Sequence, residues 1–134
     1  MKIFITGVAG FLGSHLADLM ISEGHTVAGN DNMIGGYTDN VPQNVEFHQV
    51  DCCDLENMTK AMEGCDIVYH TAATAYEGLS VFSPVLVTRN IFEASVTTIT
   101  AAIRNKVKRI VYCSSMARYG HHDEMPYKET YECR

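Results

Sequence analysis

The stretch Thr6-Gly7-Val8-Ala9-Gly10-Phe11-Leu12-Gly13 directly follows the apolar run Ile3-Phe4-Ile5 near the start of the chain. The β-branched and aromatic residues before it predict a strand, and apolar residues at helical spacing from Phe11 to Met20 predict a helix. In such a turn the first glycine permits the tight bend, the second lets the backbone approach a pyrophosphate, and the third lets the helix pack close to the strand. The pattern is typical of dinucleotide-binding α/β folds, although a tight turn without a ligand is the alternative.

Further strands are predicted from short β-rich runs, and helix-length segments lie between most of them. The runs are His25–Asp31, Val45–Val50, Ile67–Tyr69 and Arg109–Cys113, with helices expected after the N-cap residue Asp54 and from about Val85 to Asn105. Gly24 and Gly64 are expected to end the first two helices, and residues 32–44 are expected to form a loop. Strands joined through helices favour right-handed crossovers and a parallel sheet covered on both faces. The expected fold class is therefore α/β, a Rossmann-type doubly wound parallel sheet of about five strands in the order 3-2-1-4-5.

The bulk composition indicates one domain over residues 1–134, with the polar segment His121–Arg134 expected to be partly irregular. A net charge of −6 argues against a nucleic-acid partner, because such partners require a clustered basic face. Five cysteines without a Cys-x-x-Cys pair favour free thiols in a reducing cytoplasm. Four of them adjoin or lie in predicted strands and helices, where thiols are expected to be buried: Cys52, Cys53, Cys65 and Cys113. The histidines lack the spacing of a helical metal site, and the broken apolar run at the start predicts neither a signal peptide nor a membrane span.

Asp31 lies about twenty residues past the glycines, at the expected tip of the second strand. An acidic side chain at this place can accept hydrogen bonds from the adenosine ribose and repel a 2′-phosphate, which favours NAD over NADP as the cofactor. The alternative is a turn-forming or helix-capping role for the Asp31-Asn32 pair.

With these residues, the chain resembles the extended short-chain dehydrogenases/reductases, the NAD-dependent epimerase/dehydratase family that acts on nucleotide sugars. The similarity runs from Met1 to about Glu129 and includes the Gly-x-x-Gly-x-x-Gly spacing of that family. Val50-Asp51-Cys52 and His70-Thr71-Ala72-Ala73 resemble the segments that follow the family's third and fourth strands.

The resemblance implies roles for particular residues at the cofactor. Asp51 is expected to contact the adenine amino group, and Thr71, Ala72 and Ala73 are expected to lie against the ribose and pyrophosphate. Asn90 resembles the family's helical asparagine, although the residues after it depart from the family pattern. The expected cofactor contacts are thus Gly7, Gly10, Phe11, Leu12, Gly13, Asp31, Asn32, Asp51, Cys52, Thr71, Ala72, Ala73 and Asn90.

Ser115 corresponds, on the same resemblance, to the serine that hydrogen-bonds the substrate hydroxyl or keto oxygen. In the 4,6-dehydratase branch an Asp-Glu pair follows this serine. Here the two positions are Met116 and Ala117, which cannot transfer protons. Sugar dehydration is therefore disfavoured, and epimerisation or simple oxidoreduction remains.

The family's catalytic Tyr-x-x-x-Lys pair does not occur in the sequence: Tyr119 is followed four residues on by Asp123, and Tyr127 by Tyr131. We therefore expect the cofactor-binding half of a nucleotide-sugar epimerase-like oxidoreductase, truncated before the later strands and the substrate domain, and inactive alone. The alternatives are a non-catalytic dinucleotide-sensing module and a fragment that folds only by self-association. An exposed edge at Arg109–Cys113 would favour a homo-oligomer, and a nucleotide sugar would be the partner of the longer enzyme.

Overall fold

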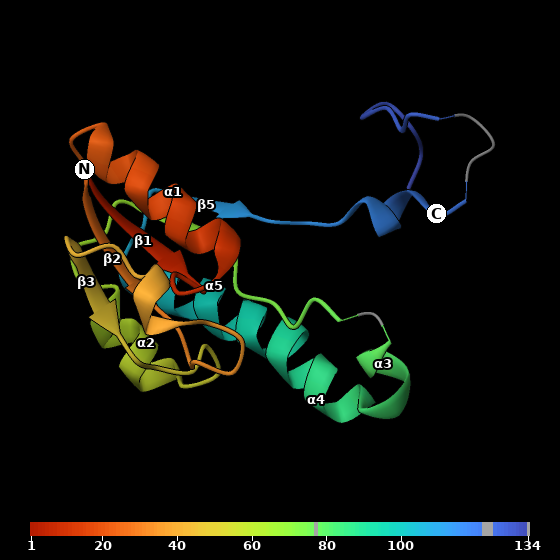
Figure 1. Ribbon diagram of the computed structural model, residues 1–134, viewed down its shortest axis with the longest axis horizontal. Coiled ribbons are helices and arrows are strands. Elements are labelled where there is room, and N and C mark those ends of the chain that lie inside the picture. The colour runs from red at the N-terminus through yellow and green to blue at the C-terminus, as the bar shows by residue number, and fades with distance from the viewer. Residues whose placement is uncertain (77, 122–124, 134) are drawn as a thin grey trace.

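A five-stranded parallel sheet forms the centre of the computed structural model, which describes residues 1–76, 78–121 and 125–133 (Figure 1). The strands lie in the order β3-β2-β1-β4-β5, as predicted. Their bounds are Lys2–Thr6 for β1, Thr26–Asn30 for β2, Val45–His48 for β3, Ile67–His70 for β4 and Arg109–Tyr112 for β5. All four strand pairs are parallel, so the predicted fold class is confirmed.

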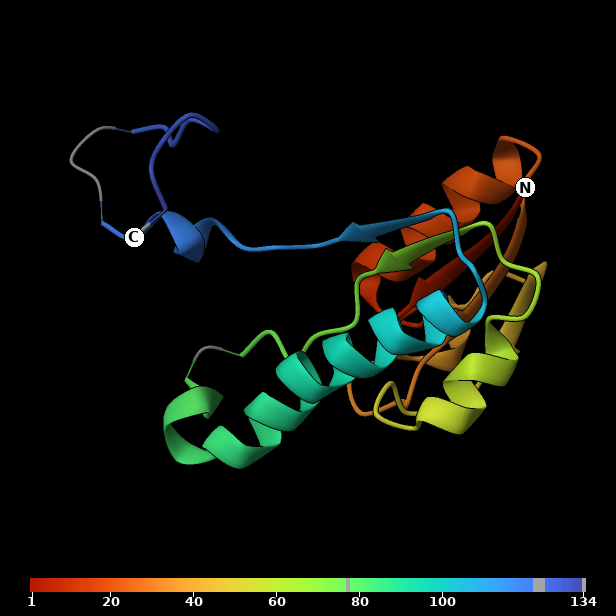
Figure 2. The ribbon, with the colours of Figure 1, turned by 180° about the vertical axis from the view of Figure 1, so that it is seen from behind.

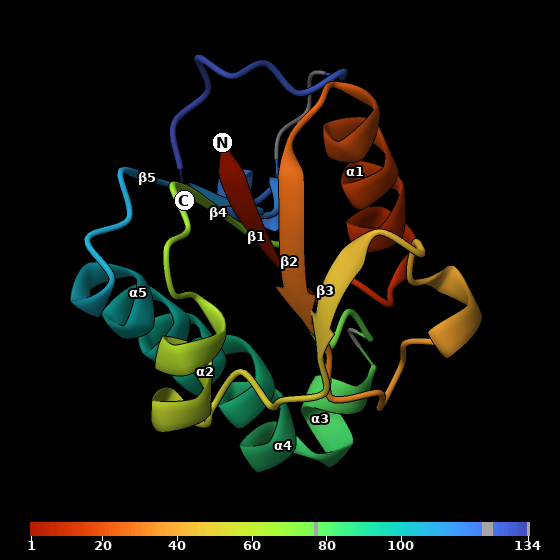
Figure 3. The ribbon, with the colours of Figure 1, turned by 90° about the vertical axis from the view of Figure 1, so that its left-hand side faces the viewer.

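Helices cover both faces of the sheet (Figure 3). Helix α1 (Phe11–Ser22) packs on one face, and α2 (Leu55–Ala61) packs on the other with α5 (Ala94–Arg104). Side chains of β1 alternate between the two layers: Ile3 and Ile5 join the cluster under α1, whereas Phe4 joins the cluster under α2 and α5. This alternation follows from the two-residue period of a strand, and it leaves β1 buried on both faces.

The helical segment predicted from Val85 to Asn105 is confirmed in extent but is not uniform. It begins with α4 (Pro84–Thr88), continues through the π-helical turn η2 (Arg89–Glu93) and ends with α5. A short helix α3 (Leu79–Phe82) precedes it, and both α3 and α4 project beyond the sheet (Figure 1). Single π-helical turns inside α-helices occur frequently at functional sites, and this one carries Asn90.

The helix ends follow the signals in the sequence. Asp54 caps α2 by accepting a hydrogen bond from the Asn57 amide at 3.1 Å, as expected. Gly24 and Gly64, which follow α1 and α2, have φ angles of +82° and +71° that favour glycine. The segment expected as a loop, residues 32–44, contains one 3-10 turn, η1 (Thr38–Asn40).

Strand β5 lies at the edge of the described sheet, and the chain then runs away from it toward the 3-10 turn η3 (Met116–Tyr119) (Figure 2). The described residues 121 and 125–133 contain turns and bends, while 122–124 and 134 of the predicted irregular tail lie outside the described residues. All five cysteines are free. No helix within the described ranges is long and apolar enough to cross a membrane.

Candidate functional site

The glycine turn between β1 and α1 requires glycine at two positions for steric reasons. Gly7 has a φ angle of +70°, and a Cβ atom there would lie 2.9 Å from the Ala72 Cα. A Cβ atom on Gly13 would lie 2.1 Å from the Gly7 carbonyl oxygen, so Gly13 allows α1 to approach the turn. The predicted packing role of the third glycine therefore has a clear steric basis.

Gly10 stands at the N-cap of α1, where the helix faces the end of the sheet. It supplies no side-chain cap, and no acidic residue occurs in the first helical turn. A Cβ atom on Gly10 would meet only the Gly7 carbonyl oxygen, at 3.2 Å, among atoms within 4 Å. The first amides of a helix lack intrahelical acceptors and carry partial positive charge, so this end of α1 is suited to an anion.

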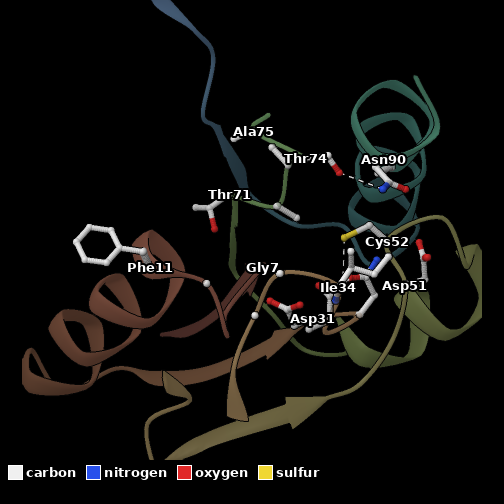
Figure 4. Close-up of a pocket in the computed structure, with 18 of the residues that line it drawn as sticks. Gly7, Phe11, Asp31, Ile34, Asp51, Cys52, Thr71, Thr74, Ala75 and Asn90 are labelled. Carbon is white, nitrogen blue, oxygen red and sulfur yellow. Dashed lines mark hydrogen bonds between the residues drawn. The ribbon is translucent and has the colours of Figure 1, made fainter. Parts of the chain in front are cut away.

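A pocket of about 380 Å³ lies beside this turn, at the carboxyl ends of β1, β2 and β4 (Figure 4). The carboxyl edge of an open parallel sheet is where ligands bind in doubly wound folds. Most of the predicted contact residues meet here: Gly7, Gly10, Phe11, Asp31, Asn32, Asp51, Cys52, Thr71, Ala72, Ala73 and Asn90. Leu12 and Gly13 do not line the pocket, because Leu12 is on the solvent side of α1 and Gly13 packs beneath the turn.

Asp31 is 8% exposed and makes two backbone contacts as well as lining the pocket. Its Oδ2 accepts a hydrogen bond from the Ala9 amide at 3.1 Å, and its Oδ1 accepts one from the Met33 amide at 2.8 Å. The turn role that the sequence left open is thus present. Each carboxylate oxygen can accept a second hydrogen bond, so these contacts are compatible with a ribose at the same carboxylate.

The loop after β2 folds back over the glycine turn. The Ala9 carbonyl accepts hydrogen bonds from the Tyr37 amide at 3.1 Å and from Asn40 Nδ2 at 3.0 Å. Gly36 lies so close that a Cβ atom there would be 2.9 Å from Asp31 Oδ2. The sequence predicts only a loop for residues 32–44, and the adjacent pair Gly35-Gly36 is its one signal of a close approach.

Asp51 lines the pocket and is held by Arg89, the first residue of the π-helical turn η2. Its Oδ1 accepts a hydrogen bond from the Cys53 amide at 2.8 Å, and its Oδ2 pairs with Arg89 Nη1 at 3.0 Å. Partial burial raises the pKa of this carboxyl, but the hydrogen bonds from Cys53 and Arg89 outweigh burial and hold the pKa below its usual value. Asp51 is therefore an anion in the neutral pH range.

Asn90, in the π-helical turn η2, forms a hydrogen bond with the loop that follows β4. Its Nδ2 donates a hydrogen bond to Thr74 Oγ1 at 3.0 Å across the pocket, as the dashed line in Figure 4 marks. Deeper in the wall, Asn30 Nδ2 donates to the Val50 carbonyl and to Cys52 Sγ. Burial raises the pKa of the Cys52 thiol, which is therefore neutral at physiological pH.

Ser115 lies outside this pocket, at a second one of about 550 Å³. The two pockets share the wall formed by residues 71–76, and the second extends to Tyr112, Cys113 and Ser115. Ser115 Oγ accepts a hydrogen bond from the Ala117 amide at 3.1 Å and so caps η3. Cys113, expected as a buried thiol because it adjoins a predicted strand, is exposed because β5 is the edge strand; that prediction was wrong.

Several residues of the site escaped sequence analysis. Additional pocket-lining residues are Asn30, Ile34, Gly35, Gly36, Thr74, Ala75, Tyr76 and Ala94. Across residues 1–76, 78–121 and 125–133, no group of three or more His, Cys, Asp or Glu side chains is arranged to hold a metal ion.

The parallel sheet, the glycine turn at its carboxyl edge and an acidic residue after β2 define a Rossmann domain of the dinucleotide-binding class. The model of the NAD dependent epimerase/dehydratase family matches residues 3–134. The chain belongs to this family, as the sequence resemblance implied, and the family's cofactor is NAD.

Relatives and solved structures agree with this assignment. A probable UDP-arabinose 4-epimerase of Arabidopsis thaliana is 32% identical over 138 residues, covering 95% of this chain and 34% of the relative. The crystal structure of a UDP-glucose 4-epimerase with UDP-glucose from Thermotoga maritima matches with a TM-score of 0.94 at 30% identity, covering 100% of this chain and 45% of that one. The UDP-glucose 4-epimerase of Thermus thermophilus in complex with NAD matches with a TM-score of 0.93 at 33% identity, covering 100% and 44%. The chain therefore spans a third to less than half of the proteins it matches.

Proposed function

We propose that this chain is the NAD(H)-binding part of a nucleotide-sugar epimerase-like oxidoreductase. The observation that carries the proposal is the convergence of Gly7, Gly10, Asp31 and Asp51 on one pocket at the carboxyl edge of the sheet. These residues follow three separate strands, and the sequence predicts each of them as a cofactor contact. A tight turn without a ligand does not account for Asp51, which follows β3 and lines the same pocket.

The residues present fit a dinucleotide in their chemistry. The uncompensated N-terminus of α1 at Gly10 suits the pyrophosphate, because its amides are donors and a side chain is absent. Asp31 and Asn32 would hold the adenosine ribose, and Asp51 and Cys52 would lie at the adenine. When bound, NAD supplies a nicotinamide ring that accepts or returns a hydride. The chain's own contribution is to bind and orient it against the wall formed by residues 71–73 and Asn90.

A nucleotide sugar is the substrate class we propose for the longer enzyme. Solved neighbours include one epimerase with UDP-glucose and another with NAD and formylated UDP-arabinopyranose. The second pocket adjoins the first through residues 71–76 and places Ser115 on its far side, where a hydroxyl could bond a sugar oxygen. Because Met116 and Ala117 cannot transfer protons, epimerisation or simple oxidoreduction is favoured over dehydration.

The cellular setting follows from the thiols. Five free cysteines in one small domain suit a reducing compartment, and we propose the cytoplasm. Self-association is part of the same proposal, because β5 presents an exposed edge with half-exposed Tyr112.

Calorimetric titration with NAD tests the proposal directly. In Gly10→Val the added side chain would occupy space that the pyrophosphate needs, so NAD binding should weaken by at least tenfold, or about 1.4 kcal/mol. Gly78→Val is the matched control, because a Cβ atom there meets nothing within 4 Å and Gly78 lines neither pocket. Circular dichroism must show that both variants fold. NAD binding by Gly10→Val at the wild-type affinity would refute the proposal.

A further inference from the structure

Hydrogen bonds join α5 to β1 through His70, and they are buried at Thr6 and partly buried at Ser95. His70 stands at the end of β4 and is 3% exposed. Its Nε2 lies 3.0 Å from Ser95 Oγ, and its Nδ1 lies 2.7 Å from Thr6 Oγ1. His70 lines the second pocket, but neither the proposed NAD contacts nor the proposed sugar contact of Ser115 includes it.

The hydrogen bonds that Ser95 and Thr6 make determine which nitrogen of His70 carries a proton. Ser95 Oγ donates its proton to the Ile91 carbonyl at 2.6 Å, so toward His70 it can only accept. The neutral His70 ring must therefore carry its proton on Nε2 and leave Nδ1 as an acceptor. Thr6 Oγ1 then donates to that nitrogen.

The Thr6 hydroxyl is fully used by this arrangement. Its oxygen accepts hydrogen bonds from the amides of Thr71 and Ala72, both at 3.1 Å. A hydroxyl has one proton and two lone pairs, so donation to His70 completes its capacity. The Thr71 hydroxyl adds a reciprocal bond to the Thr6 carbonyl at 2.5 Å.

These bonds fix the wall that separates the two pockets. Residues 71–76 line both of them, and the Ala72 backbone lies against Gly7 so closely that a Cβ on Gly7 would be 2.9 Å from Ala72 Cα. A shift of the Thr71 and Ala72 amides would therefore change the space over the glycine turn.

We propose that His70 is a positioning residue: as the neutral Nε2–H tautomer it orients Thr6, which holds the wall of residues 71–73 in the form that binds the dinucleotide. The proposal rests on the proposed NAD binding. A second proton on Nδ1 would point a third donor at Thr6 Oγ1, which has no lone pair left. One of the two amide bonds must then break, and the wall moves.

Among residues 1–76, 78–121 and 125–133, no charged side chain shifts the pKa of His70. The side chains that face it are Thr6 from β1, Ser95 from α5 and Tyr112 from β5, whose ring centroid lies 5.6 Å away. Tyr112 is the titratable group of this set. Burial lowers the pKa of His70, and it does so without help from a charged neighbour.

Nitrogen-15 spectroscopy of the full chain tests the proton assignment without any cofactor. We expect shifts of the Nε2–H tautomer for His70 at pH 7.5, and we expect the Thr71 and Ala72 amide resonances to move together with His70 as it titrates on acidification. The Nδ1–H tautomer, or amides that stay in place while His70 titrates, would overturn the proposal. These outcomes are independent of whether NAD binds.

Variants that lack the hydroxyl of Thr6 or of Ser95 test whether the hydrogen bonds through His70 affect NAD binding. Thr6→Val should weaken NAD binding by about tenfold, the scale of one lost buried hydrogen bond, whereas Thr6→Ser should retain wild-type affinity. Ser95→Ala should weaken binding severalfold and shift its pH dependence. Thr100→Val is the matched control, since Thr100 Oγ1 makes the same kind of bond to the Val96 carbonyl within α5.

The outcomes separate this proposal from the proposed function. Wild-type binding that is unaffected by Thr6→Val and Ser95→Ala, in folded variants, would refute the positioning role and leave NAD binding intact. A wild-type protein that fails to bind NAD would refute the proposed function and the positioning role with it. The spectra would still show whether His70 is the Nε2–H tautomer and whether the Thr71 and Ala72 amides respond to its titration.

Discussion

Asp31 Oδ2 accepts a hydrogen bond from the Ala9 amide at 3.1 Å, so the carboxylate after β2 is tied directly to the glycine turn after β1. The two features on which dinucleotide recognition depends are therefore parts of one structure. A change at Asp31 should alter both the preference between cofactors and the stability of the turn.

Cofactor preference is the first expected consequence. The chain should bind NAD at least tenfold more tightly than NADP, because a 2′-phosphate would place like charges together in a partly desolvated site. Asp31→Asn should narrow this ratio by removing the charge while keeping the shape. It should also lower the free energy of unfolding by about 1–3 kcal/mol, because the asparagine oxygen can accept from only one of the Ala9 and Met33 amides, and without a charge. Paired calorimetric titrations and urea denaturation measure the two effects; equal wild-type affinities would contradict the Asp31 assignment.

The contact between Gly36 and Asp31 gives a second prediction. In Gly36→Ala the new methyl group would lie 2.9 Å from Asp31 Oδ2 and 2.8 Å from the Ala9 Cβ. Relief of this overlap should cost about 1–3 kcal/mol of stability and displace the carboxylate, so NAD affinity should fall as well. Gly35→Ala is the stability control, because a Cβ atom there meets nothing within 4 Å. If the two variants unfold at the same urea concentration, the loop is free to yield and Gly36 is not a constraint.

Local patterns predicted the parts of the fold that local sequence determines. The Asp54 cap and the glycines after α1 and α2 each depend on a few neighbouring residues, and each was predicted correctly. The strand order followed from the handedness of crossovers joined through helices.

Contacts between distant segments could not be inferred in this way. The bonds from Thr6 to residues 70–72 join positions 64 to 66 residues apart, and no periodicity in the chain encodes them. The π-helical turn around Asn90 escaped for another reason, because the apolar spacing of a helix does not reveal one extra residue in a turn. Cys113 was misjudged because a strand-like run does not show whether the strand is central or at an edge.

Acid should destabilise the fold through His70, which is our third prediction. Its pKa lies below the ordinary value of 6.5 because burial disfavours the charged form, so the unfolded chain takes up this proton first as pH falls. The contribution of His70 to stability is therefore complete above pH 6.5 and declines as pH falls toward the lower pKa of the folded state. Urea denaturation of the wild type and of His70→Phe between about pH 8 and 5 gives the free energy of unfolding of each protein as a function of pH. The difference between the two pH slopes is the contribution of His70. Identical slopes would show that His70 titrates alike in both states.

Self-association through β5 is the last prediction. Among the described residues β5 is the edge strand, with Val111 37% exposed and Tyr112 50% exposed. An edge with unpaired backbone groups and apolar side chains is a template for another strand, and two identical edges meet most simply in antiparallel pairing across a two-fold axis. Light scattering after size exclusion should give a dimer or larger species at micromolar concentration. Val111→Lys should shift the chain toward the monomer, because it places like charges across that axis. Ile103→Lys, on an exposed position of α5, distinguishes this edge from association through the helix. A monomeric wild type would refute the prediction. If only Ile103→Lys yields a monomer, the interface lies on α5 and not at the β5 edge.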